Sequence, residues 1–342
     1  HNQTRTVFVM DDRNDDSSEA TIASILSSGS ASNSEVFHIE KNRFIGFGQA
    51  RTLSLEMAWK YFPHASHVMI ADPDWRPVVE TMKLQDLIQA NAEVYRFTVY
   101  DRNGVTTRQI DWLLRHRPTL SMRYHLHEVL NIGYYSWTNV PWQVREIEQA
   151  GTWHTRVGHS DSFDAKRYLF DLSMLEADKE MYPNDPHCDY YLGITHSAYA
   201  EKLRMQPLAA RLGLEVGANI SSGAPGGLTA ADMEARESLK STLDYHYQQA
   251  IKSLLTRITS KYEHEFIEQR WGSMLTLSHM YDDAMWVSTY DSVSANTWYQ
   301  LCRDFNKNTF ECSSFLVQQY LRIGVLKEAI FEANVLIRTE FK

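Results

Sequence analysis

The spacing of apolar residues divides the chain into a first half of short strands and helices and a second half of helices alone. Short apolar or alternating runs that are typical of strands occur at residues 5–10, 35–39, 67–71 and 93–100. Helical patterns occur at residues 19–27, after Gly46 and Gly48, and at 81–90. Because strand, loop and helix repeat, we expect an α/β domain with a mainly parallel sheet.

From about residue 161 the pattern becomes helical throughout. Residues 164–181 and 188–204 predict two helices, separated by the proline-rich break at 183–186. Residues 213–229 hold five glycines and a proline and predict a long loop, and 231–342 are helical again. Helix pairs of this size stack in the manner of tetratricopeptide repeats. We therefore expect an α/β domain at 1–160 and an all-α helical-repeat domain at 161–342.

The composition of the 342-residue chain excludes some classes of binding partner. Its formal net charge of -9 argues against a nucleic-acid partner, which clustered Lys and Arg would bind. No run of about 18 apolar residues is present, so we expect no transmembrane segment. Cys302 and Cys312 could pair in an oxidising compartment, but three scattered cysteines favour free thiols. The cytoplasm and the lumen of the secretory pathway both remain open as locations.

Acidic residues follow two of the predicted strands. Asp11 and Asp12 end the first run, and Asp72-Pro73-Asp74 follows the run at 67–71. In parallel sheets, ligands bind at the carboxyl ends of the strands. Two carboxylates two residues apart on a bend can face one Mn²⁺ or Mg²⁺ ion, since both cations prefer oxygen ligands. A capped turn explains the D-x-D segment equally well.

Three further segments carry candidate chemistry. Glu128 could act as a general base on a hydroxyl. His125 and His127, two apart on an expected strand, could join a metal site, or they could be ordinary surface histidines. His154 could add a nitrogen ligand to a metal held by carboxylates. Arg51, near the start of a helix, could pair with a phosphate or simply face solvent.

The order of these segments resembles that of family 2 glycosyltransferases with a GT-A, Rossmann-like fold. Six segments carry the resemblance: 7–18, 48–53, 68–74, 127–130, the His154 and Gly158 segment, and the tail start at 167–193. The resemblance implies that Asp11 and Asp12 contact the nucleoside and that Arg51 lies near the diphosphate. It implies that Asp72 and Asp74 hold the metal beside the nucleotide sugar, with His154 completing the site.

The resemblance further implies an inverting, metal-dependent sugar transfer in which Glu128 is the base. The donor would be a UDP-sugar, or alternatively a GDP-sugar, and the acceptor hydroxyl would belong to a glycan, peptide or lipid. Two departures stand out. The family has one more strand and helix before the position of Val7, a unit we expect to be missing here, and Arg13 replaces a usual glycine.

Two other functions remain open from the sequence. The missing first unit is also compatible with a catalytically inactive glycosyltransferase-like protein whose helical tail recruits a partner. The alternative enzyme is a metal-dependent hydrolase that uses His125, His127, Glu128 and a later histidine.

Overall fold

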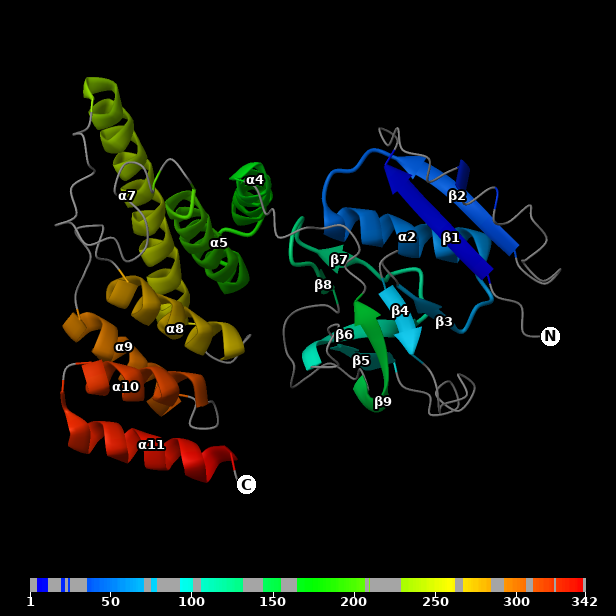
Figure 1. Cartoon of the computed structure of the whole chain (residues 1–342). Helices are drawn as coiled ribbons and strands as arrows, with labels where there is room; N and C mark the ends of the chain where they lie inside the picture. The colour runs from blue at the N-terminus through cyan, green and yellow to red at the C-terminus, as the bar shows by residue number, and fades with distance from the viewer. Residues whose placement is uncertain are drawn as a thin grey trace. The chain divides into compact units, whose positions relative to one another are not determined.

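The protein consists of a mixed α/β unit followed by an all-helical unit (Figure 1). The two compact units comprise His1–Ser162 and Phe163–Lys342. The computed structural model describes residues 5–11, 20–21, 24, 36–70, 75–78, 93–100, 106–131, 144–154, 165–206, 209, 229–261, 267–283, 292–305, 310–322 and 324–340. The predicted helices at 19–27 and 81–90 and the predicted loop at 213–229 lie wholly or largely outside these residues.

The strands of the first unit form three separate ladders in the described part of the chain. Strands β1 (Arg5–Asp11) and β2 (Val36–Asn42) make a parallel pair. A five-stranded sheet has the order β3-β6-β5-β9-β4. Its strands are β3 (His67–Met69), β4 (Trp75–Val78), β5 (Val94–Tyr100), β6 (Thr106–Arg115) and β9 (Val144–His154). Strands β7 (Met122–Arg123) and β8 (Val129–Leu130) form a short third ladder.

The expectation of a mainly parallel sheet is wrong for the five-stranded sheet. Only β5 and β9 pair in parallel, whereas β3–β6, β5–β6 and β4–β9 are antiparallel. Only five residues, 101–105, separate β5 from β6. Antiparallel neighbours can be joined by such a short link, but a parallel crossover needs a dozen residues or more. The short link, which itself lies outside the described residues, is therefore consistent with the antiparallel pairing of β5 and β6.

Helix α2 (Phe47–Tyr61) covers the hydrophobic core of the first unit. Leu55 points from the helix into a buried cluster with Val94, Leu114 and Leu120. The burial of such side chains contributes about 1.5–3 kcal/mol each relative to exposure. This packing fixes α2 against β5 and β6.

The second unit is a succession of helices in which each packs against the next (Figure 1). The helices are α4 (Ala165–Met181), α5 (Pro186–Arg204), α7 (Ala230–Thr259), α8 (Ile267–Asp283), α9 (Ser292–Phe305), α10 (Phe310–Arg322) and α11 (Leu326–Glu340). The helices predicted at 164–181 and 188–204 are confirmed. Gly324, with φ of 77°, makes the predicted turn between α10 and α11.

The ends of these helices follow from local chemistry. Asp185 caps α5, accepting a hydrogen bond from the His187 N–H at 3.0 Å, and Pro186 occupies the first turn. Thr229 and Asp232 form a reciprocal capping box at the start of α7. Each cap satisfies backbone N–H groups that a helix leaves without partners.

Polar contacts between neighbouring helices lie inside this unit. Four of them connect α5 with α4, α7 and α8: Lys179 Nζ–Asp189 Oδ1 at 2.7 Å, Arg204 Nη1–Tyr247 Oη at 2.9 Å, Gln269 Nε2–His187 Nδ1 at 3.0 Å and His196 Nδ1–His246 Nδ1 at 2.8 Å. Because an unpaired buried polar group is costly, these pairings favour one register of the helices.

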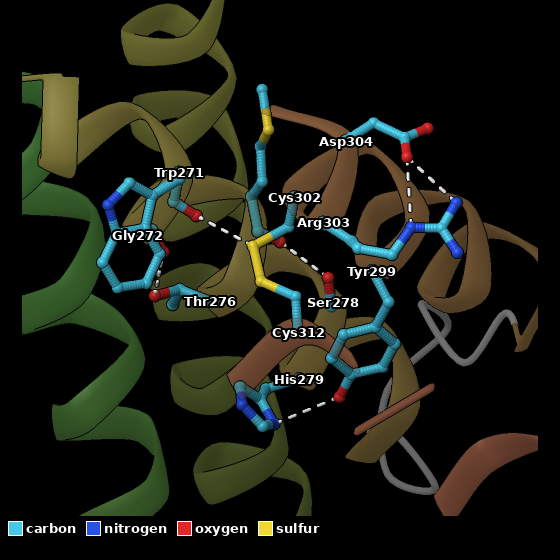
Figure 2. The surroundings of a disulfide bond; sticks show 11 residues. Trp271, Gly272, Thr276, Ser278, His279, Tyr299, Cys302, Arg303, Asp304 and Cys312 are labelled. Carbon is cyan, nitrogen blue, oxygen red and sulfur yellow. Dashed lines mark hydrogen bonds and ion pairs between the residues drawn. A yellow bond between two sulfur atoms is a disulfide. The ribbon is translucent and has the colours of Figure 1, made fainter. Parts of the chain in front are cut away.

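A disulfide joins Cys302 of α9 to Cys312 of α10, as Figure 2 shows. Both cysteines are fully buried, beside Tyr299 and His279, whose hydroxyl and Nδ1 lie 3.2 Å apart. The prediction of free thiols at these two positions is therefore wrong, because the packing of α9 against α10 brings the two sulfurs together. Cys188 is a free, buried thiol.

Within the described ranges, no helix has both the length and the apolar character needed to cross a membrane.

We predict that the helical unit loses stability between pH 6.5 and pH 4. Burial, with a smaller contribution from the nearby His246, lowers the pKa of His196 to about 4, and burial also lowers the pKa of His246. Below pH 6.5 these two histidines therefore gain protons in the unfolded chain that they do not yet bind in the folded chain, so their contribution to the free energy of unfolding falls by about 2–3 kcal/mol. Burial raises the pKa of Asp171 and Asp189, which offsets part of this loss in the whole unit. Urea unfolding followed by circular dichroism measures this change.

The double variant His196→Gln/His246→Asn should show a flatter pH dependence over this range. The control His64→Gln, which removes an exposed imidazole from the first unit, should keep the full dependence. Equal slopes in the double variant and the wild type would contradict the assignment.

We also predict that thiol reduction destabilises the helical unit. The cross-link spans a sequence separation of 10, and closing a loop of this size is worth about 2–3 kcal/mol. Urea midpoints with and without dithiothreitol should differ for the wild type and for Cys188→Ala, which removes a thiol but no cross-link. They should coincide for Cys302→Ala/Cys312→Ala; a reductant-insensitive wild type would argue against the bond.

Candidate functional site

The first turns of α2 are fastened to the segment that leads from β7 to β8. The Phe47 N–H donates to the His125 carbonyl at 2.7 Å. The Met122 N–H donates to Thr52 Oγ1 at 2.8 Å, and that hydroxyl donates to the Gly48 carbonyl at 2.8 Å. Two links far apart in sequence thus hold the helix against this segment.

Glycine is required where the two backbones meet. A Cβ atom at Gly48 would lie 2.1 Å from the Tyr124 carbonyl oxygen, and one at Gly46 would lie 2.7 Å from the His125 ring. Carbon and oxygen atoms cannot approach so closely without displacing the backbone. The Gly-x-Gly at the start of α2 therefore permits a contact that other residues would prevent.

Two residues of the facing segment have left-handed backbone conformations. Tyr124 has φ of 68° and His127 has φ of 55°. Such conformations are uncommon outside glycine, cost about 1–3 kcal/mol each, and are concentrated at functional sites. The chain bends at both positions, so residues 124–127 form no strand.

These bends correct the expectation that His125 and His127 lie two apart on one strand, from which they could have joined a metal site. His125 is buried against Gly46, whereas His127 is exposed. The alternation of a strand would have placed both imidazoles on one face, but the left-handed turn at His127 removes that relation.

The same bends bring two of the predicted site residues together. Arg51 Nε of α2 donates a hydrogen bond to Glu128 Oε1, which makes an ion pair between residues 77 apart in sequence. Their side chains are only 18% and 17% exposed, respectively. Hydrogen bonds between charged partners are about twice as strong as neutral ones. The predicted base therefore has a cationic partner that can also bind phosphate.

Sheet pairing places the backbone of another predicted residue, His154, at the start of β4. His154, the last residue of β9, lies opposite Trp75, the first residue of β4. Residues opposite one another in an antiparallel pair have Cα atoms about 4.5–5.5 Å apart. Trp75 directly follows Asp74 in sequence, so the His154 backbone lies beside the strand that the D-x-D segment enters.

Of the remaining predicted site residues, the structure describes only Asp11. Asp11 ends β1, opposite Asn42 of β2. Asp12, Asp72 and Asp74 lie outside the described residues. Among the residues that are described, no three His, Cys, Asp or Glu side chains group as metal ligands. In the part of the chain that the structure describes, β1 and β3 belong to different sheets, so sheet pairing alone does not bring their ends together.

Sequence reasoning missed the residues that support Arg51 and Glu128. Thr52 connects α2 to β7, and Tyr124 makes the first bend. The glycines at the helix start were the available signal for a close backbone approach. A threonine inside a helix and a tyrosine between two histidines carry no comparable signal.

No protein-family model matches the chain, and a search of curated protein sequences gives no significant match. The functional proposal therefore depends on the residues and their arrangement.

We predict that Gly48→Ala destabilises the first unit by about 1–3 kcal/mol, because the added methyl group forces α2 away from Tyr124. In an open helix, the same substitution stabilises by up to about 1 kcal/mol. Urea unfolding followed by tryptophan fluorescence measures the difference. Gly272→Ala in α8 is the matched control: its Cβ would lie 3.1 Å from the Tyr190 hydroxyl, a much longer distance than the 2.1 Å at Gly48. Similar effects of both substitutions would contradict the close approach.

Proposed function

We propose that the chain is a metal-dependent, inverting glycosyltransferase whose first unit has a GT-A fold and whose second unit is a helical-repeat tail. The donor is a nucleoside-diphosphate sugar, with UDP favoured over GDP, and the acceptor is a hydroxyl of a glycan, peptide or lipid. One observation carries the proposal: Arg51 and Glu128, chosen from distant segments for complementary roles, form an ion pair.

The pairing of β4 with β9 gives independent support. It puts the His154 backbone opposite Trp75, next in sequence to Asp74. Two carboxylates, Asp72 and Asp74, and one imidazole are a donor set that suits Mn²⁺ or Mg²⁺. A metal bound there would stabilise the negative charge of the departing diphosphate as a Lewis acid. These residues would hold the cation, and Asp11 and Asp12 would contact the nucleoside.

The transfer step assigns one task to each residue. Glu128 accepts the proton of the acceptor hydroxyl on a carboxylate oxygen. The oxygen then bonds to the anomeric carbon from the face opposite the leaving group, which inverts the configuration. The bond between that carbon and the diphosphate oxygen breaks, and the nucleoside diphosphate leaves with the electron pair. Arg51 binds the diphosphate through its guanidinium, whose planar donors match phosphate oxygens.

The hydrolase alternative receives no support from the described geometry. It needs the imidazoles of His125 and His127 at one cation, but one is buried and the other exposed. The partner-binding alternative remains as one possible outcome of the experiment below.

We predict that UDP-sugars or GDP-sugars raise the melting temperature of the protein only in the presence of Mn²⁺, and that Asp74→Asn abolishes this stabilisation. A ligand at 100 times its Kd stabilises the folded state by about 2.7 kcal/mol, which thermal shift detects readily. The carboxylate matters because the neutral amide is a weaker ligand for a hard cation.

Glu56→Gln is the matched control, since it removes one carboxylate from the exposed face of α2. It should keep the metal-dependent stabilisation. Absence of stabilisation by any donor in the wild type, together with tight binding of a protein partner, would instead favour the inactive, partner-recruiting function.

A further inference from the structure

Arg51 and Glu128, which both have a role in the proposed reaction, bind each other in the free protein. A carboxylate oxygen that accepts a hydrogen bond from a guanidinium has that lone pair engaged. It cannot take a proton from an acceptor hydroxyl along the same direction. A guanidinium bonded to a carboxylate is likewise shared with any diphosphate that approaches it. The ion pair therefore limits both proton acceptance by Glu128 and diphosphate binding by Arg51.

The backbone keeps the two residues in place without help from the ion pair. Thr52 is hydrogen-bonded to Met122, and Phe47 is hydrogen-bonded to His125. Phe47 and Thr52 flank Arg51 on the helix, and their two partners precede Glu128 in the sequence. These bonds and the close approach at Gly48 hold the first turns of α2 against the segment that precedes Glu128. The side chains can consequently exchange partners while the surrounding backbone stays fixed.

We propose that Arg51 and Glu128 form a donor-operated latch. In the free protein, the Glu128 carboxylate is bound to the Arg51 guanidinium. The diphosphate of the donor displaces the carboxylate from the guanidinium, and the released Glu128 becomes available to accept the proton of the acceptor hydroxyl. The latch rests on the proposed glycosyl transfer, and it makes Arg51 a residue that couples donor binding to activation of the base.

The electrostatics favour this exchange. The partly exposed ion pair holds one negative charge on the carboxylate, whereas a nucleoside diphosphate carries at least two. Both anions fit the planar fork of the guanidinium. Removing the competing carboxylate should therefore tighten nucleotide binding by about three- to tenfold, which corresponds to about 0.7–1.4 kcal/mol, because the ion pair no longer has to be broken.

The experiment measures binding of UDP, and in parallel GDP, with Mn²⁺ by isothermal titration calorimetry. Glu128→Gln removes the charge but keeps the shape of the side chain. The matched control is Glu93→Gln, which removes an equal charge from another ion-pair centre of the same unit, where Glu93 contacts Arg115 at 3.1 Å and Arg117 at 2.6 Å. Circular dichroism and melting temperature establish that each variant is folded.

A double-mutant cycle separates the latch from simple charge repulsion. Arg51→Gln should weaken nucleotide binding, and adding Glu128→Gln to it should give no further gain, because the contested cation is gone. Repulsion between Glu128 and the diphosphate predicts the reverse. Without Arg51 to neutralise it, the carboxylate would repel the nucleotide more, and its removal would bring a larger gain.

Each outcome has a defined meaning. A three- to tenfold gain for Glu128→Gln that disappears in the Arg51→Gln background, with no gain for Glu93→Gln, supports the latch. No gain, or a gain that persists without Arg51, overturns the latch while leaving the nucleotide site in place. Failure of UDP and GDP to bind the wild type and every variant overturns the latch and the proposed transferase function together.

Discussion

The close approach of α2 to the segment between β7 and β8 is the constraint on which the candidate site depends. Two glycines allow the backbones to meet, and the Phe47 and Thr52 hydrogen bonds hold them there. Leu55, one turn further along, anchors the same helix in the core. The position of Arg51 is therefore determined from both sides, by backbone contact at the helix start and by hydrophobic burial beyond it.

The helical unit is stabilised by a different balance of interactions. Its helices pair a buried carboxylate with a partly exposed cation, as in Asp189 with Lys179 and Glu332 with Arg303. Such pairs contribute little net stability, because desolvation offsets the attraction, but removing the cation leaves a buried charge and is costly. They restrict the ways in which the helices can pack. The disulfide adds a covalent restriction between α9 and α10.

The sequence predicted features that arise from local chemistry. The helix boundaries near 164–181 and 188–204 follow from apolar spacing and proline breaks, and Gly324 follows from the need for a left-handed turn. Strand pairing was mispredicted, because apolar alternation shows that a strand exists but not which neighbour it meets. The Cys302–Cys312 bond likewise depends on how α9 and α10 pack, which their spacing alone cannot determine.

At the site, the sequence selected Arg51 and Glu128 for separate reasons, a phosphate-binding helix start and a general base, and it contained no indication that they touch. Their contact depends on the left-handed backbone at Tyr124 and His127. Tyrosine and histidine rarely adopt this conformation, so the sequence does not predict it. The same turns separate His125 and His127, which the sequence pattern placed on one face of a strand. The backbone hydrogen bonds of Phe47 and Thr52 hold α2 against this segment, so the arrangement does not rest on the ion pair alone. That property allows the two side chains to serve a ligand as well as each other.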